Sequence, residues 1–175
     1  ISLESFDSNP DYYNVSIHDN NIDNGAIAFG SLGSWGTTYR QVHVYNNTIT
    51  GAYVAAIGPT SGDASTQIID CSITGNKIVN PYYSGITVTK TAGQVLLKRN
   101  EITNSNIAQD ATTFDKGAIY IEDTTDLVCE DNDIYMGVVS PADANFSPFG
   151  IKYAGTNVNL QLRNNRIRNR TVSNP

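Results

Sequence analysis

One pattern of apolar and polar positions recurs along the chain: apolar, any, apolar, any, any, Asn, any, Ile. Six segments carry it, and both the Asn and the Ile are present in every copy. Successive Asn positions lie 27, 29, 24, 32 and 33 residues apart, so the spacing varies while the pattern does not. A stacked repeat with fixed turns and free loops behaves in this way. The copies are residues 15–22, 42–49, 71–78, 95–102, 127–134 and 160–167.

A second short element lies between the copies. Apolar side chains recur two positions apart, which is the periodicity of a strand, in residues 25–29, 53–57, 84–88, 117–121 and 149–153. Each turn is therefore expected to contain a strand that ends in an Asn bend, a short piece after the Ile, and another strand. Parallel stacking would place equal positions about 4.8 Å apart, so that Asn amides can hydrogen-bond from turn to turn. Asn also tolerates the left-handed backbone of a bend.

These copies and the strands between them resemble the repeats of parallel β-helices in the pectate-lyase-like superfamily. The resemblance extends over about residues 12–170 and implies an all-β fold, a right-handed single-stranded parallel β-helix of about six turns with an Asn ladder. Members of the superfamily bind or cleave polysaccharides, and they include secreted lyases, hydrolases and epimerases and the tailspikes of bacteriophages. The resemblance thus implies a polysaccharide partner, an extracellular or virion location and, for a tailspike-like protein, a homotrimer. The sequence contains no catalytic signature of a single family.

Length and charge limit the alternatives. The 175 residues are expected to form one domain, with residues 1–11 leading into the first turn and residues 12–175 forming the β-helix, as a fragment of a longer chain. The formal net charge of −6 argues against a nucleic-acid partner, which would need a basic surface. No apolar run reaches the roughly 18 residues of a membrane span.

The cysteines and histidines indicate neither a disulfide nor a metal site. Cys71 and Cys129 fall at inward positions two turns apart, which exceeds the roughly 7 Å that a disulfide allows, so two buried free thiols are predicted. His18 and His43 lie on neighbouring turns in different outward columns, without the spacing of a zinc motif. No cofactor is therefore expected.

Two long insertions follow the Ile of the fourth and fifth turns, in residues 103–116 and 135–148. Insertions at the same corner of neighbouring turns should lie side by side, and they are expected to form a wall beside residues 118–121 and 150–153. Loops of this length in a compact repeat are usually functional or form an interface. Shorter loops are predicted at residues 30–40 and 58–66.

Side chains between the apolar positions should point outward. Lys98, Glu130 and Arg163 alternate in sign in one outward column, which indicates ion pairs between turns. Leu96 and Val128 are adjacent apolar residues in a second outward column, so either a loop or another subunit is expected to cover them.

Acidic side chains supply the candidate catalytic groups, because glycoside cleavage needs two carboxyl groups roughly 5–10 Å apart. Strand alternation places Tyr120 and Glu122 outward, with Lys152 beside Tyr120 in the next turn. This group could hold a sugar, or it could remove a proton from a uronic acid with Lys152 or Tyr120 as the base. An ordinary ion pair beside a solvated Tyr is the structural alternative. The other candidates are Asp115 and Asp143 for catalysis and Asp110, Asp123, Trp35, Tyr39 and Tyr45 for substrate binding.

The three aromatic candidates are included because a pyranose face stacks on a ring, although such residues also pack loops onto the body of a protein.

Two functions follow from the whole pattern. The first is a polysaccharide-binding and polysaccharide-degrading β-helix, a tailspike-like depolymerase that acts as a glycoside hydrolase or a lyase. The second is a non-enzymatic shaft or receptor-binding spacer, in which the long loops only lock subunits together.

Overall fold

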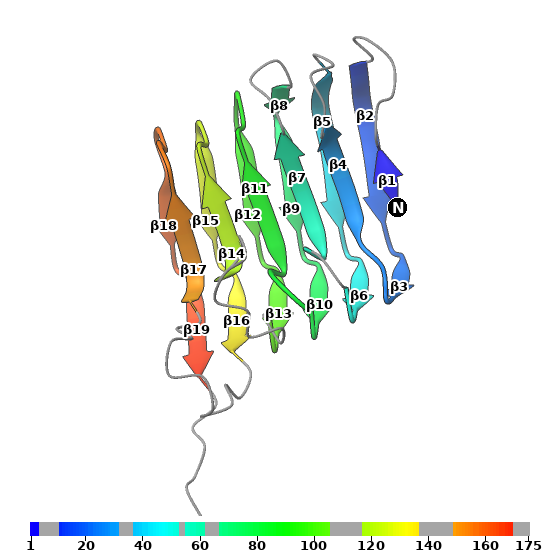
Figure 1. Cartoon of the computed structure of the whole chain (residues 1–175), viewed down its shortest axis with the longest axis vertical. Coiled ribbons are helices and arrows are strands. Elements are labelled where there is room, and N and C mark those ends of the chain that lie inside the picture. Colours follow the sequence, from blue (N-terminus) through cyan, green and yellow to red (C-terminus); the bar gives the residue numbers. More distant parts are fainter. Residues whose placement is uncertain are drawn as a thin grey trace, which may run out of the picture.

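The computed structural model describes residues 1–3, 11–31, 37–52, 55–61, 67–105, 117–136 and 149–169, and there the chain winds through three parallel sheets. Figure 1 shows the turns following one another from the blue N-terminal strands to the red C-terminal ones. All pairings between the strands of these sheets are parallel. The predicted all-β parallel β-helix is therefore confirmed.

Each turn contributes one strand to each sheet. Sheet A contains β1 (Ser2–Leu3), β4 (Ile27–Ser31), β7 (Ile57–Ser61), β11 (Ile86–Thr89), β14 (Gly117–Glu122) and β17 (Phe149–Ala154). Sheet B contains β2 (Asp11–His18), β5 (Thr38–Tyr45), β9 (Cys71–Thr74), β12 (Val95–Lys98), β15 (Leu127–Glu130) and β18 (Gln161–Arg163), and β8 (Gln67–Ile69) also pairs with β5. Sheet C contains β3 (Asn21–Asp23), β6 (Thr48–Thr50), β10 (Lys77–Val79), β13 (Glu101–Thr103), β16 (Asp133–Met136) and β19 (Arg166–Asn169).

We call β1, β2 and β3 the N-terminal rung and β17, β18 and β19 the C-terminal rung. These two rungs are the edges of all three sheets, because each sheet begins with a strand of one and ends with a strand of the other. The described residues before the first repeat already belong to the N-terminal rung, since β1 pairs with β4.

Two columns of isoleucine form much of the core, because strand alternation points every second side chain inward. In sheet C the column is Ile22, Ile49, Ile78, Ile102, Ile134 and Ile167. In sheet A it is Ile27, Ile57, Ile86, Ile119 and Ile151. The residue before the sheet A column is Ala or Gly in each turn. A Cβ atom on Gly85 would lie 2.7 Å from Cγ2 of Ile102, so a larger residue at position 85 would collide with the sheet C column in that turn.

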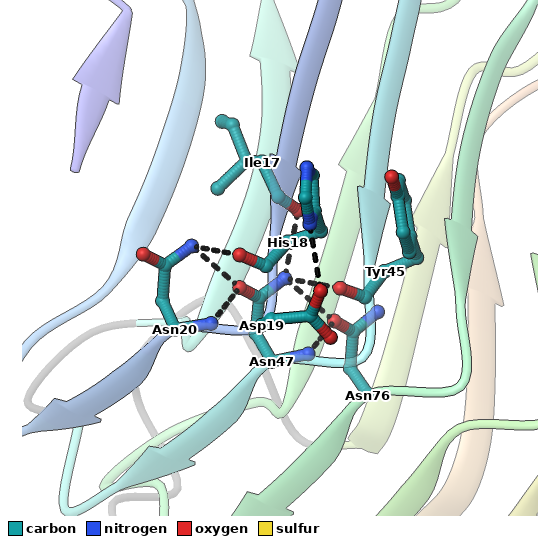
Figure 2. A network of polar contacts seen from close by, with 7 residues as sticks. All are labelled: Ile17, His18, Asp19, Asn20, Tyr45, Asn47 and Asn76. Atoms are coloured by element: carbon teal, nitrogen blue, oxygen red, sulfur yellow. Dashed lines mark hydrogen bonds and ion pairs between the residues drawn. The ribbon is translucent and has the colours of Figure 1, made fainter.

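The Asn column forms a continuous hydrogen-bonded ladder, as predicted (Figure 2). The side-chain amide of each of the first five Asn residues donates to Oδ1 of the Asn in the following turn, at 2.8–3.0 Å. The same oxygen accepts the main-chain N–H of the preceding Asn. The amide also donates to a strand carbonyl of the turn before. The column therefore satisfies polar groups that this corner buries.

The left-handed backbone at this corner belongs to the residue before the ladder Asn and not to the Asn itself. Its φ is 51–64° in every turn, at Asp19, Asn46, Gly75, Arg99, Asp131 and Asn164. Asp, Asn and Gly are the residues that adopt this geometry most readily. Arg99 is the exception, so residue type alone does not identify the position.

Strand boundaries differ from the prediction in the second turn. Residues 58–61 were expected in a loop, but they continue β7, which begins at Ile57. Hydrogen bonding to β4 on one side and β11 on the other explains this extension, since a central strand gains ladder bonds from both neighbours.

Cys71 and Cys129 are free and buried, as predicted, and burial raises their pKa values to about 11 and about 12.

Candidate functional site

The strand pairing of sheet A brings three of the predicted site residues together. Tyr120 in β14 and Lys152 in β17 are register partners, and Lys152 Nζ lies 5.5 Å from the centre of the Tyr120 ring. Glu122 lies two residues beyond Tyr120 on the same face of β14 and is half-buried. The negative face of the ring attracts the ammonium group. The predicted placement of Lys152 beside Tyr120 is confirmed.

Tyr120 is buried, however, with an exposed fraction of 6%. Tyr120 is therefore not the solvated tyrosine of the structural alternative. Its partner in β11, Thr87, is also buried, so this part of the outer face of sheet A is covered. Strand alternation decides which side of a sheet a residue faces, but it does not decide whether another layer lies on that side. The ring therefore presents no open face on which a sugar could stack.

Asp123 connects two turns at the corner after β14. Its backbone is left-handed, with a φ of 50°, and its Oδ1 accepts the main-chain N–H of Thr156 at 2.7 Å. A Cβ atom on Gly155 would collide with this carboxylate, so the contact also requires glycine in the next turn. Asp123 thus has a structural role, the hydrogen bond that joins two turns, besides its predicted role in binding.

Tyr39 is a core residue, so its predicted role in substrate binding is wrong. It is fully buried, and its ring stacks on Tyr12 with centroids 5.1 Å apart and an interplanar angle of 7°. The ring of Phe29 lies 6.2 Å away, and the Tyr39 hydroxyl donates to the carbonyl of Leu3 at 3.0 Å. Tyr39 occupies an inward position of β5 and links sheet B to sheet A.

Four predicted site residues lie outside the residues that the structure describes. These are Trp35 in the first loop, Asp110 and Asp115 in the first long insertion, and Asp143 in the second. Their roles in catalysis or binding stay predictions.

A partly exposed aromatic pair lies on the outer face of sheet B. The rings of His18 and Tyr45 stack with centroids 4.7 Å apart and an interplanar angle of 8°. They are register partners in β2 and β5, and Figure 2 shows them side by side next to the Asn ladder. The His18 side chain is 44% exposed, and its Nδ1 lies 2.8 Å from the Asp19 carboxylate. Of the described substrate-binding candidates, Tyr45 is the aromatic residue that reaches the surface.

A shallow groove of about 340 Å³ begins at Tyr45 and crosses three turns of sheet B. Its lining consists of Tyr45, Asn46, Thr74, Gly75, Lys98 and Arg99. The groove thus combines the edge of an aromatic platform with hydroxyl and amide groups and two cations. These are the polar and apolar contacts that a sugar ring with its hydroxyls can use.

Lys98 is held by carboxylates of the next turn. Its Nζ lies 2.6 Å from Oε1 of Glu130 and 3.8 Å from Oδ2 of Asp131. The predicted ion pair between Lys98 and Glu130 is confirmed. The hydrogen bond from Lys98 lowers the pKa of Glu130, so its carboxyl group is ionised at neutral pH. Glu130 is therefore a hydrogen-bond acceptor for the groove residue Lys98 and a poor proton donor.

Comparison with known proteins places the fold in a family. Residues 33–173 match the family described as right handed beta helix region. The chain belongs to this right-handed β-helix family. No curated protein and no solved structure matches it. The β-helix fold supports a polysaccharide-related or a structural role.

Two further grooves lie on the same outer face of this β-helix and share Gln94. One, of about 210 Å³, is lined by His43, Asp70, Cys71, Ser72, Gln94 and Leu96, and His43 Nδ1 is 2.8 Å from Ser72 Oγ. The other, of about 300 Å³, is lined by Gln94, Asp126, Val128, Asn159 and Gln161. Leu96 and Val128 are register partners and both are half-buried. The outer face of sheet B therefore offers a series of shallow depressions with both polar and apolar linings across five turns.

The described part of the chain offers neither a metal site nor a membrane-spanning helix. No three of its His, Cys, Asp and Glu side chains come together in a way that could hold a metal ion. Within the same residues, none of the structure is a helix long and apolar enough to cross a bilayer.

Sequence reasoning did not assign Asn46, Thr74 or Arg99 to a site. The available signal was the fourth position of the repeated pattern, which is His18 in the first copy and Tyr45 in the second. Rings at the same outward position of consecutive turns lie next to each other and stack. In the third and fourth copies the same position holds Thr74 and Lys98, which line the groove.

Proposed function

We propose that this β-helix binds a polysaccharide along the outer face of sheet B. A sugar ring would rest on the platform of His18 and Tyr45, and its hydroxyl groups would bond to Asn46, Thr74 and Arg99 in the adjacent groove. The observation that carries the proposal is this partly exposed, stacked aromatic pair at one end of a polar groove.

The shape and charge of the face favour a carbohydrate over other ligands. The grooves are shallow and open along the stacking direction, which suits an extended polymer better than an enclosed small molecule. The net charge of −6 disfavours a polyphosphate partner. Aromatic rings with neighbouring hydroxyl, amide and guanidinium groups provide both an apolar face and donors for sugar hydroxyls.

This groove is better suited to binding than to cleavage. Glycoside hydrolysis requires a carboxyl group that is protonated at working pH, and such an acid has a raised pKa. The pKa of Glu130 is instead lowered by Lys98. The platform would therefore hold the polymer while any chemistry takes place elsewhere.

The binding test is a comparison of two tyrosines on a polysaccharide panel measured by calorimetry. Tyr45→Ala removes the platform and should weaken binding about tenfold, which corresponds to about 1.4 kcal/mol. Tyr135→Ala is the matched control, because Tyr135 is a half-buried outward tyrosine on sheet C and should leave affinity unchanged. Equal loss in both variants, or no binding to any polysaccharide, would reject the proposal.

Depolymerase activity of the tailspike-like kind is a second proposal, supported by the grouping of Glu122 with Lys152 on sheet A. Glu122→Gln and Asp115→Asn should abolish the release of reducing ends while the melting temperature stays unchanged. Release of reducing ends by both variants at the parental rate would exclude these two carboxylates as catalytic groups. Asp143, Asp110 and Trp35 would then need the same test.

A structural role is the alternative to both proposals. Leu96 and Val128 lie together on the outer face of sheet B, where the side-by-side homotrimer implied by the family resemblance would cover them. A stable trimer in solution that binds no polysaccharide would support this alternative and, with it, a shaft or spacer in an extracellular or virion assembly.

A further inference from the structure

We propose that Ser72 and His43 act as nucleophile and general base in the hydrolysis of short-chain acyl esters. The two side chains come from neighbouring turns of sheet B, and His43 Nδ1 lies 2.8 Å from Ser72 Oγ. They are register partners in β9 and β5, so the parallel strand pairing holds them together. The activity is independent of polysaccharide binding, because a free ester is a sufficient substrate.

The hydrogen bond between the two side chains has the geometry that activates a serine. A hydroxyl group is a weak nucleophile unless an adjacent base accepts its proton, and the two atoms must lie about 2.6–3.2 Å apart. His43 meets this requirement when its ring carries the proton on Nε2, because Nδ1 then accepts the hydroxyl proton of Ser72. Both side chains are half-buried, so neighbouring residues restrain them while a small molecule and water can still reach them.

The pair lies in a groove that fits a small ester. The groove has a volume of about 210 Å³, and Gln94 and Leu96 of the next turn also line it. Leu96 is the register partner of Ser72, so an apolar side chain lies directly beside the nucleophile. This side chain can contact the methyl group of a bound acetyl ester, and the small volume favours an acetyl group over a long acyl chain.

Gln94 supplies a hydrogen-bond donor for the charge that the reaction creates. Attack on an ester places negative charge on the carbonyl oxygen, and donors aimed at that oxygen stabilise the transition state. The main-chain N–H of Cys71 already donates to the main-chain carbonyl of Gln94, as expected inside a sheet. The side-chain amide of Gln94 lines the groove instead and can donate to the substrate oxygen.

The reaction takes two steps that balance without a cofactor. In the first step, Ser72 Oγ attacks the carbonyl carbon, the hydroxyl proton passes to His43 Nδ1, and the bond to the alcohol oxygen breaks as that oxygen takes the proton. In the second step, water attacks the acyl-serine, His43 accepts a proton from the water, and Ser72 leaves with that proton. The products are a carboxylic acid and an alcohol, and both side chains are restored.

A sugar hydroxyl is the alcohol that the position of the pair favours, and this choice rests on the polysaccharide binding proposed above. His43 and Tyr45 lie two residues apart on the same face of β5, which is about 7 Å along the strand. An acetyl group on a sugar held at Tyr45 would therefore reach Ser72. The substrate class is then an O-acetylated polysaccharide.

Hydrolysis of p-nitrophenyl acetate tests the pair. Ser72→Ala and His43→Gln should each lower kcat/KM about a hundredfold, and the double variant should lose no more, because the two groups act together. Gln94→Leu should lower kcat and leave KM nearly unchanged, since its donor acts in the transition state. Ser16→Ala is the matched control, because Ser16 occupies the same outward column on the other side of His43 and should leave the rate unchanged.

Mass spectrometry of the protein quenched with acid should find an acetyl group on Ser72, and circular dichroism checks that every variant is folded. Three results would each overturn the proposal: a parental rate no higher than that of Ser72→Ala, an equal loss in Ser16→Ala, or acetyl groups found only on other residues.

The release of acetate from O-acetylated polysaccharides tests the choice of alcohol. The parental chain should release acetate, and Ser72→Ala should not. Hydrolysis of the free ester without release from any acetylated polysaccharide would reject the sugar substrate and leave the ester hydrolase standing. Absence of polysaccharide binding in calorimetry, with the free ester still hydrolysed, would reject only the polysaccharide-binding function.

Discussion

The middle turns and the C-terminal rung place the same residues at the same positions of the repeat but protect them differently. Leu97 and Leu162 share one inward column, yet Leu97 is fully buried and Leu162 is 44% exposed. Ile102 and Ile167 share the ladder-side column, with exposed fractions of 0% and 49%. A middle turn has a neighbour on each side, whereas the end rung has one.

The comparison shows that burial in this fold is decided by neighbouring turns rather than by residue type. Repeat proteins gain stability from each repeat and from each interface between adjacent repeats. The free energy of unfolding that a substitution removes should therefore grow with the number of inter-turn interfaces that the residue contacts. The predictions below compare equal positions in the middle and at the end, beginning with the largest expected effect.

Asn76→Ala should cause the largest loss of stability. Its Oδ1 accepts two hydrogen bonds from Asn47, and its amide donates to Val44 and Asn100. Removal leaves several buried polar groups unpaired, at roughly 1–3 kcal/mol each, so the free energy of unfolding should fall by about 4 kcal/mol. Urea denaturation measures this. Asn20→Ala, at the open end of the ladder, should lower it by only about 1 kcal/mol, and equal losses would contradict the role assigned to the ladder.

Leu97→Ala should destabilise the protein by about 3 kcal/mol, because it leaves a cavity between two packed turns. Leu162→Ala removes the same atoms from a half-exposed position and should lower the unfolding free energy by less than about 1 kcal/mol. Thermal and urea denaturation give both values. A loss at Leu162 as large as at Leu97 would show that another layer covers the C-terminal rung.

Both thiols should be unreactive in the folded protein at pH 8. Burial raises the pKa of Cys71 to about 11 and that of Cys129 to about 12, so neither forms a thiolate at that pH. Labelling with a thiol reagent should proceed only after unfolding. Above about pH 9 the unfolded state loses thiol protons that the folded state retains, so stability should decline as pH rises toward the folded pKa values. Fast labelling of the native protein would place a thiol at the surface.

The smallest effect is expected at the half-buried ion pair between Lys98 and Glu130. Because Lys98 lowers the pKa of Glu130, the pair stabilises the fold above the ordinary pKa of about 4.5, and this contribution is lost as pH falls through the lowered value. Below pH 4.5 the melting temperature of the parental chain should therefore fall slightly more than that of the Glu130→Gln variant. Identical acid profiles of the two proteins would show that the pair contributes nothing.

The sequence predicted the fold well because one constraint repeats in every turn. An apolar residue at each inward position and an Asn at each bend can be satisfied together only by parallel stacking. The register of Tyr120 with Lys152, the ion pair of Lys98 with Glu130 and the ladder from Asn20 to Asn165 all follow from aligning the copies. The left-handed corner did not follow, because the residue there ranges from Gly75 to Arg99.

The candidate site was predicted less well than the fold. Two of its predicted residues, Tyr39 and Tyr120, show the reason. Tyr39 lies before the repeated pattern, so its inward direction became visible only with its stacking on Tyr12. Tyr120 has the outward direction that alternation gave it, but it is buried.

The sequence by itself determined which residues stack on which, because the repeat is local and its periodicity fixes the direction of every strand side chain. Only the tertiary structure decided which of those side chains meet solvent. Exposure depends on what lies over a face and on whether a further turn follows, and neither is encoded in the repeat. This is why Tyr120 is covered, Tyr45 is partly accessible and Leu162, in the last described rung, is exposed.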